Sequence, residues 1–559
     1  MKRKFEKYPE ITVSATHIYN YMINDHLVDW LRLYKKEAYN RDEFTEYICE
    51  KGNEFETKLI DYINNNRIQS QFISKYITDE TCSQTIELMM QGVPMIHSAP
   101  VRNTINNTHG IIDLLIRSDY LPHLIEHLPI EFQPTLKAPK LTGDYHYVVI
   151  DIKFSSLKIM ADGKHLLNIG KQPAYKGQVK IYTDAIGMIQ GYTSPYGFIM
   201  GRKYIYTREN RTENNSLYTL GIIDYSTVDR NYIYSTREAI HWVRLVKGEG
   251  SQWSLSPPSL RELYPNMCID SGPWMAEKRR IAEELKEITL IWNCGIKNRN
   301  IAIQNQICSW DHQHLNSASI GINNNYTETI NSIISINQQT ETNIKPLIIQ
   351  NNLFGWKARE NEIFVDFETL SDIFTDLTEL PVQTSTELIF MIGTGFINNE
   401  GAFEYKNFIC SELSPQEENR IIYEFLTWLQ TRNYPKIYYW SAEPSIWKRA
   451  IGRHNLSTPE IRWCDLYRIF KLEPIVIRGC FDYSLKSVAK AMKQHGMITC
   501  SLDDNSCNSG MLAMLRAWKH YKGEADTDVM NSIALYNQFD CKVLYEILEY
   551  LRSTQVNSK

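Results

Sequence analysis

The chain has 559 residues, a formal net charge of -5, and 43% hydrophobic and 12% aromatic residues. This length predicts two to four domains, and the composition is sufficient for packed cores. The mild acidity excludes a uniformly basic, histone-like surface but is compatible with a local basic channel. No apolar run is long enough to span a membrane, and the basic start lacks the apolar core of a secretory signal. The eleven cysteines are scattered, so we expect reduced thiols in an intracellular protein.

The first half of the chain mixes predicted helices and strands, assigned from apolar periodicity and β-branched runs. Helices are predicted at 18–34, 49–63 and 175–189, and strands at 110–116, 148–155, 196–206 and 216–225. Residues 235–300 are predicted to be mostly helical and include the basic cluster Lys278–Arg280, a candidate for phosphate contacts.

Residues 321–352 are amide-rich and almost free of charge, and this composition predicts a linker, assigned as 321–357, although its isoleucines leave open that part of it packs. Beyond it, strands are predicted at 362–370, 387–396, 405–409 and 436–440, and helices at 416–432 and 532–552. Strands followed by alternating helices and strands are typical of an α/β or mixed-sheet domain.

The stretch Val148–Ser155 is predicted to be a buried strand that carries two charged residues. Asp151 and Lys153 are two residues apart, so on a strand they project from the same face. A carboxylate can hold a divalent metal ion, and a lysine can orient water or stabilise charge on a phosphate. The simpler alternative is an exposed ion pair at the end of a strand, so the interpretation depends on partners elsewhere in the chain.

Four further residues supply such partners. Glu56 lies on the predicted helix at 49–63. Asp113 lies within an apolar strand, where an acid is costly to bury unless it is paired or bound to metal. Gln178 and Tyr182 are four residues apart and share one helical face, although alone they would be an ordinary half-exposed pair.

In order, spacing and element type, this set resembles the RecB-type branch of the PD-(D/E)XK nucleases, which includes the CRISPR-associated RecB-like exonucleases. The resemblance covers about residues 11–205. It implies phosphodiester hydrolysis, with the three acids holding one or two Mg²⁺ or Mn²⁺ ions, the lysine positioning water, and the glutamine and tyrosine orienting DNA or the lysine. The implied catalytic set is Glu56, Asp113, Asp151, Lys153, Gln178 and Tyr182.

Some relatives bind an iron–sulfur cluster through one early cysteine and three late ones. The early helix of this chain contains no cysteine, and the late candidates Cys268, Cys294 and Cys308 include no close pair. We therefore expect no iron–sulfur cluster and interpret these cysteines as core residues.

Basic and aromatic residues follow the first motif and are candidates for a nucleic-acid channel, since bases of single strands stack on aromatic rings among cations. Each of them is equally compatible with a solvated helix face. The candidates are Lys171, Tyr175, Lys176, Lys180, Arg202 and Lys203.

A second pair of acids lies in the predicted strand at 362–370. Asp366 and Glu368 share one face of that strand, and Tyr536 and Asp540 are one turn apart on the predicted C-terminal helix. These D-x-E and Y-x-x-x-D motifs resemble the DEDD exonuclease superfamily, and most of all the ribonuclease H-like domains found fused to RecB-like nucleases. The amide- and isoleucine-rich composition suits an AT-rich coding genome, and the chain also resembles giant-virus nucleases of the CRISPR-associated RecB-like type.

The second motif of that superfamily places an Asp where a helix starts after a strand. Glu443 stands at the matching position here, and Asp465 is the alternative. The resemblance implies two metal ions held by four carboxylates, with the tyrosine orienting water. Because Glu443 is one methylene longer than Asp, catalytic competence of this site stays open, and the simpler alternative is an acidic pair at a strand end. The implied set is Asp366, Glu368, Glu443, Asp540 and Tyr536.

Together the motifs predict an α/β protein with two domains. A PD-(D/E)XK restriction-endonuclease-like domain with a helical extension is assigned to 1–320, its helical connector to about 210–320, the linker to 321–357, and a ribonuclease H-like domain to 358–559.

The expected function is that of a Mg²⁺- or Mn²⁺-dependent deoxyribonuclease, an exonuclease or endonuclease, in DNA processing, repair or defence against foreign DNA. Two alternatives stay open: an RNA or DNA exonuclease that uses the second site, and a non-catalytic nucleic-acid-binding assembly protein. The expected partner is single- or double-stranded DNA, not a membrane, and a helicase and a second copy of the chain are further candidates. The expected location is the cytoplasm or nucleus, or the host cytoplasm for a viral protein.

Overall fold

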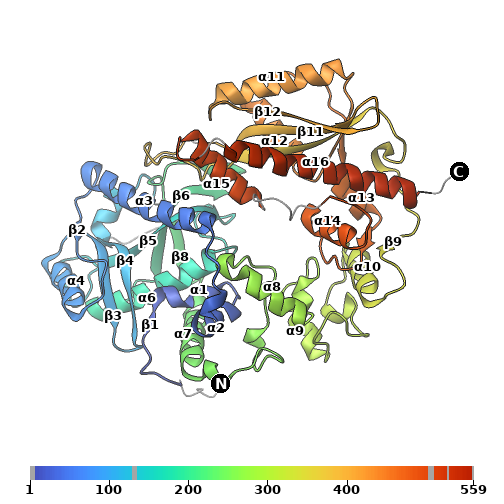
Figure 1. The fold of residues 1–559 in the computed structure, drawn as a ribbon. Coiled ribbons are helices and arrows are strands. Elements are labelled where there is room, and N and C mark those ends of the chain that lie inside the picture. Colours follow the sequence, from blue (N-terminus) through green and yellow to red (C-terminus); the bar gives the residue numbers. More distant parts are fainter. Residues whose placement is uncertain (1–6, 129–134, 385, 501–508, 526–527, 557–559) are drawn as a thin grey trace. The chain divides into compact units, whose positions relative to one another are not determined.

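The computed structural model describes residues 7–128, 135–384, 386–500, 509–525 and 528–556 (Figure 1). The chain divides into two compact units. Unit 1 comprises Met1–Leu285 and the segment Asp376–Thr384, and unit 2 comprises Lys286–Thr375 and Ser385–Lys559. None of the helices in these described ranges is both long and apolar enough to cross a membrane.

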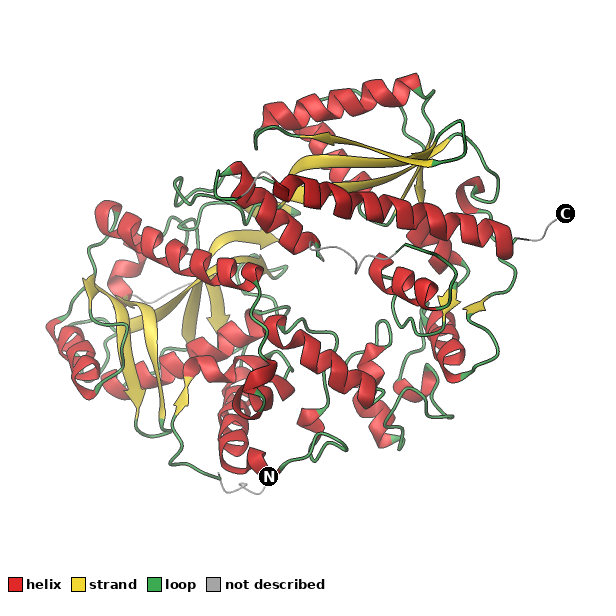
Figure 2. Cartoon of the chain, viewed as in Figure 1, coloured by secondary structure: helices red, strands yellow, loops and turns green. Residues whose placement is uncertain are grey.

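Unit 1 is built on an eight-stranded mixed sheet of order β2-β3-β4-β5-β6-β7, with β1 paired to β4 and β8 paired to β6 (Figure 2). The central strand β5 is antiparallel to β4 and parallel to β6. The strands are β1 (Val13–Ser14), β2 (Gln71–Phe72), β3 (Met95–Asn103), β4 (Thr108–Arg117), β5 (Tyr147–Ile159), β6 (Tyr196–Tyr206), β7 (Arg211–Glu213) and β8 (Gly221–Asp224).

Two long helices, α3 (Glu43–Asn66) and α6 (Gln172–Gln190), pack against this sheet. Val148 and Ile150 of β5 belong to the apolar core that contains α3, whereas Val149 belongs to the core that contains α6. The alternation expected of a strand thus divides the sheet into two apolar faces. The other helices of unit 1 are α1 (Tyr19–Met22), α2 (Leu27–Tyr34), α4 (Asp79–Gln91), α5 (Leu121–Leu124), α7 (Tyr232–Glu249) and α8 (Met275–Glu284).

The helix predicted at 18–34 is interrupted. A 3₁₀ turn η1 (Ala15–Ile18) leads into α1, and α2 starts only after a break in which Asn24 has φ 61°. The next residue, Asp25, is buried, and both of its carboxylate oxygens lie 3.1 Å from Lys278 Nζ. Lys278 also donates to the Ile269 carbonyl at 2.6 Å and is buried, so the interpretation of this lysine as a phosphate contact is wrong.

The segment Asp376–Thr384 follows strand β10 (Glu362–Leu370) in the chain but belongs to unit 1. Leu377 and Leu380 pack on the core that contains α3. The Pro381 carbonyl accepts a hydrogen bond of 2.8 Å from the Ser216 amide. This segment, from the second half of the chain, therefore completes the apolar core on the α3 side of unit 1.

Unit 2 contains a five-stranded sheet of order β12-β11-β10-β13-β14, in which β12, β11 and β10 are antiparallel and β13 and β14 are parallel to β10. Helices α11 (Pro415–Thr431) and α16 (Asp528–Thr554) lie on opposite sides of this sheet (Figure 1). The remaining strands are β11 (Leu388–Ile397), β12 (Phe403–Ile409), β13 (Lys436–Tyr439), β14 (Trp463–Asp465) and the separate pair β9 (Ile344–Lys345) and β15 (Val476–Ile477).

The region predicted as a linker is not an extended connection. Residues 327–338 form helix α10, whose isoleucines Ile330, Ile333 and Ile336 are buried in the core of unit 2, and the division between the units falls earlier, after Leu285. Periodic isoleucines outweigh the polar composition because they supply an apolar helix face. The other helices are α9 (Ile296–Gln304), α11 (Pro415–Thr431), α12 (Glu443–Arg453), α13 (Leu466–Leu472), α14 (Leu485–Gln494), α15 (Gly510–Tyr521) and α16 (Asp528–Thr554).

The buried pair of Asp25 and Lys278 yields a stability prediction. Lys278→Met removes the cation and leaves a buried carboxylate unpaired, so we expect a loss of about 3–5 kcal/mol in the free energy of unfolding of unit 1. The double variant Asp25→Leu/Lys278→Met removes both charges and should recover a large part of that loss. Urea unfolding followed by tryptophan fluorescence measures both effects, and a single variant within about 1 kcal/mol of the parent protein contradicts the prediction.

Candidate metal centres

The first candidate site lies where strands β4 and β5 separate. Their pairing ends at Leu114 and Ile150. Two residues further along β5, the Ile152 N–H donates to the side chain of Asp113, at 2.7 Å from Oδ2, and not to a backbone carbonyl of β4. The carboxylate therefore replaces a backbone acceptor, and the sheet opens at Asp151.

Asp151 occupies the centre of this opening and is fully buried. Its Oδ2 atom lies 2.7 Å from Lys153 Nζ, as expected for two residues on the same strand face. Its Oδ1 atom accepts a bond of 3.3 Å from Gln178 Nε2, which also donates to the Tyr182 hydroxyl at 3.0 Å. The Asp151–Lys153 contact is an ion pair and not an aligned hydrogen bond, since Oδ2 has no hydrogen-bond partner in the described part of the chain.

Charge at the first site is unbalanced. Burial raises the pKa of Glu56, and the nearby Asp151 carboxylate adds to that increase. Burial and Asp151 likewise raise the pKa of Asp113 well above its usual value. Burial opposes the charged form of Lys153, but Asp151 and Asp113 outweigh it and raise the pKa of the ammonium. Lys153 faces three acids, and Lys75 acts on Glu56 as well, so the acids still outnumber the cations and the arrangement favours a further cation.

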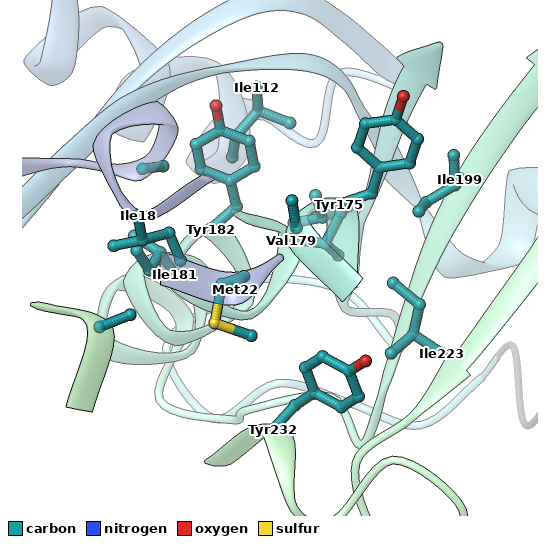
Figure 3. Close-up of a cluster of buried hydrophobic side chains, with 14 of the residues drawn as sticks. Ile18, Met22, Ile112, Tyr175, Val179, Ile181, Tyr182, Ile199, Ile223 and Tyr232 are labelled. Atoms are coloured by element: carbon teal, nitrogen blue, oxygen red, sulfur yellow. The ribbon is translucent and has the colours of Figure 1, made fainter. Parts of the chain in front are cut away.

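Tyr182 is held in place by packing. It belongs to the apolar cluster that α6 forms with Ile18, Met22 and Ile112 (Figure 3). A Cβ atom on Gly110 of β4 would lie 2.4 Å from the Tyr182 ring, so only glycine lets the ring approach this strand. The apolar cluster therefore fixes the hydroxyl that orients Gln178.

The predicted nucleic-acid contacts are corrected at three positions. Lys176 is fully buried and pairs with Asp229 at 2.6 Å. Lys180 is buried beside Asp184, and Arg202 is buried with bonds to Gln383 and Ser156. These cations are engaged inside unit 1, because a buried charge is stable only with a partner.

The other three candidates differ from one another in exposure. Lys171 is exposed and Lys203 is partly exposed. Tyr175 is largely buried, with its ring 5.6 Å from Lys153 Nζ. Tyr175 therefore contributes to the wall of the first site, and Lys171 and Lys203 stay candidates for contact with nucleic acid.

The second candidate site brings together acids of unit 2 that are far apart in the sequence. Asp366 and Glu368 on β10 and Asp540 on α16 each offer an oxygen within 4.8 Å of the other two. Among the residues described by the structure, this is the only group of three or more acidic, His or Cys side chains so close together. Such a set of carboxylate oxygens could hold a divalent metal ion.

Glu443 and Asp465 behave differently. Glu443, the first residue of α12, is buried, and its carboxylate is close enough to influence the pKa values of Asp366 and Asp540. Asp465 caps α13, accepting bonds of 3.3 Å from the amides of Arg468 and Ser441. Glu443 also accepts a backbone bond, of 3.1 Å from the Ala442 amide, but it acts on the pKa values of Asp366 and Asp540, so it is the better candidate for a fourth acid. Tyr536 lies beside Asp540. Burial is the main reason that the pKa of the Tyr536 hydroxyl is raised, and the Asp540 carboxylate is the second.

Sequence reasoning missed Asn537, which is fully buried between the acids. Its Nδ2 atom donates to Asp366 Oδ2 at 2.8 Å and to Glu368 Oε1 at 3.2 Å. Its Oδ1 atom accepts from the Tyr405 hydroxyl at 2.9 Å. A Cβ atom on Gly393 would lie 1.5 Å from that Oδ1, so this glycine makes room for the amide. The available signal was position: residues 537 and 540 are three apart on one helix face.

The acids of the second site repel one another. Burial raises the pKa of Glu368 to about 7, although the Asn537 hydrogen bond acts in the opposite direction. Burial raises the pKa of Glu443 to about 8, with Asp465 and Glu368 adding to the shift. Burial and the neighbouring carboxylates raise the pKa values of Asp366 and Asp540 well above the usual range. Without a cation, these groups cannot all be charged at neutral pH.

Comparison with known proteins agrees with this geometry. A model of the RNase_H superfamily matches residues 364–552, which include all the acids of the second site. No curated protein sequence matches the chain. Unit 2 thus contains a ribonuclease H-like domain, and this match suggests a nuclease-like function.

Asn537 is predicted to position the acids of the second site. Asn537→Ala removes the bonds that hold Asp366 and Glu368, so we expect Mn²⁺ affinity to fall by about 10–100-fold with the fold retained. Isothermal calorimetry in an Asp151→Asn background isolates the second site. The control is Asn531→Ala on the exposed side of α16, which should leave affinity unchanged; equal affinities for the two variants would contradict the assignment.

Metal binding at the second site should strengthen with pH. Raised pKa values mean that the folded protein holds protons that the unfolded chain releases, so metal-free stability falls between about pH 5 and about pH 8. Metal must displace those protons, and the rise in Tm caused by Mn²⁺ should grow over the same range. Differential scanning calorimetry of the Asp151→Asn protein measures this gain. Glu368→Gln should reduce both trends, and a pH-independent gain is the contrary result.

Proposed function

We propose that the chain is a metal-dependent nuclease with two hydrolytic sites, one in each unit. The observation that carries the proposal is the group of Asp366, Glu368 and Asp540 within a region that matches the RNase_H superfamily. The residues of both sites fit Mg²⁺ or Mn²⁺, hard cations that prefer carboxylate oxygens. A bound divalent ion would neutralise phosphate charge and lower the pKa of water.

For unit 1 we propose a PD-(D/E)XK-type site that cuts DNA. The buried Asp151 carboxylate supports it, because its Oδ2 atom has only the Lys153 ammonium beside it among the described residues and keeps a lone pair that suits a metal ligand. Asp113 and Glu56 would complete the ligand set. Lys153 stays charged beside Asp151 and would stabilise the negative charge that develops on the phosphate, while Gln178 orients the Asp151 carboxylate.

For unit 2 we propose an exonuclease-type site that accepts DNA or RNA. Asp366, Glu368, Asp540 and Glu443 would hold the metal ions, and Tyr536 beside Asp540 would orient the attacking water. Glu443 reaches the site with one methylene more than aspartate. Because metal ligands must be placed within about half an ångström, we expect this site to contribute less to DNA degradation than the first.

The relative contributions of the two sites to cleavage are tested by measuring the activity of single variants on DNA and on RNA in Mn²⁺. Asp151→Ala and Lys153→Ala should each reduce DNA cleavage by at least about a hundredfold, because each removes a ligand or a charge acting on the transition state. Asp366→Ala should reduce DNA degradation far less and remove any cleavage of RNA. EDTA should abolish both activities.

Circular dichroism and Tm values serve as controls that each variant is folded. Lys58→Ala, on the same helix as Glu56 but paired with Glu54, should retain full activity. If Asp366→Ala lost DNA degradation as completely as Asp151→Ala, the second site would be an equal partner. Full DNA cleavage by a folded Asp151→Ala protein would contradict the assignment of the first site.

A further inference from the structure

A cavity of about 270 Å³ lies in the helical part of unit 1. None of the acids of the first site is among the residues that line it. Four basic side chains line it, each from a different element: His17 of η1, Arg32 of α2, Lys36 of the 3₁₀ turn η2 (Lys36–Ala38) and Lys247 of α7. Basic residues from four separate elements converge here only because the helices pack around the cavity.

The cations of the cavity form no ion pair with an acid among the described residues, although Arg32 is near enough to Asp29 to influence the pKa of its carboxyl group. Within the described residues, no ion pair joins Arg32, Lys36 or Lys247 to an acidic side chain, and Lys247 donates only to the Thr12 carbonyl at 3.2 Å. The one acid in the lining, Asp29, is already engaged: its oxygens accept from Asn20 Nδ2 at 2.7 Å and from Trp242 Nε1 at 3.0 Å. The three cations outnumber this one acid, so the cavity carries an excess of positive charge.

His17 adds a second, independent observation. Its Nδ1 atom is buried and has no hydrogen-bond partner among the described residues, which is unusual for a buried polar atom. Burial, followed by Lys247 and Arg32, lowers its pKa to about 4. The imidazole is therefore neutral at pH 7 and offers one unused hydrogen-bonding nitrogen among cations that repel one another.

The remaining lining is apolar. Leu33, Val243 and Val246 form that part of the wall, so the cavity combines a cationic side with a hydrophobic one. Inorganic phosphate would use only the cationic side. A ligand that carries a phosphate on a sugar or a base would use both sides.

We propose that this cavity binds the phosphate group of a nucleotide, with the apolar wall against its sugar or base. Arg32, Lys36 and Lys247 would contact the phosphate, and His17 Nδ1 would form one hydrogen bond. The ligand could be a free nucleotide or the phosphorylated end of a DNA strand, which present the same chemical group. The inference rests on the cavity and not on the proposed nuclease activity.

Binding is measured on the full-length protein in EDTA, so that no metal ion recruits phosphate to the acids. The probes are inorganic phosphate and 2′-deoxyadenosine 5′-monophosphate, by calorimetry, and a short single DNA strand with a 5′-phosphate or a 5′-hydroxyl end, by fluorescence anisotropy. We expect the nucleotide to bind more tightly than inorganic phosphate. A preference for the 5′-phosphorylated strand alone would identify a strand end as the ligand.

The matched variants are Arg32→Gln/Lys36→Gln in the cavity and Lys35→Gln beside it. Lys35 lies outside the lining and pairs with Glu37 at 3.8 Å, so it reports on non-specific attraction. The cavity variant should weaken binding at least about tenfold and the control less than about twofold. The proposal is overturned if the parent protein binds none of the phosphate-bearing probes, or if both variants weaken binding equally. Unchanged Tm values verify that the exposed substitutions leave the fold intact.

Discussion

Both units bury carboxyl groups that raise one another's pKa values, and the surrounding structure is arranged around that repulsion. Two full negative charges at the 4.8 Å limit seen for Asp366, Glu368 and Asp540 would repel by about 3 kcal/mol at an effective dielectric constant of about 20. Burial adds a desolvation cost for each charge. Folding alone cannot remove this penalty, so the acids hold protons or attract a cation.

The two units moderate the repulsion in different ways. In unit 1 an ammonium group, Lys153, comes from the same strand face as Asp151, and a break in strand pairing brings Asp113 toward them. In unit 2 an uncharged amide, that of Asn537, donates to two acids at once and packs against Gly393. An internal cation lets a site stay partly charged without metal, whereas an amide only aligns the acids. The second site should therefore depend more strongly on bound metal for its order.

Local patterns predicted much of this structure. The strands at 196–206 and 362–370 have the predicted bounds, because alternating or continuous apolar residues set both their start and their end. The pairing of Asp151 with Lys153 follows from strand periodicity alone. What could not be predicted depends on distant residues. Asn537 donates a hydrogen bond to Asp366, 171 positions earlier, and Lys176 forms a buried ion pair with Asp229. A charge pattern shows that a lysine needs a partner or water, but only the fold decides which.

The excursion of Asp376–Thr384 into unit 1 has a consequence for how the protein is made and how it can evolve. During synthesis, strand β10 leaves the ribosome before the residues that complete the α3 side of unit 1, so unit 1 cannot finish folding on its own sequence. A gene fragment ending after Leu285 would lack Leu377 and Leu380 and leave apolar surface uncovered. Recombination at a single point between the units would break the same contacts, which favours inheritance of the two units as one piece.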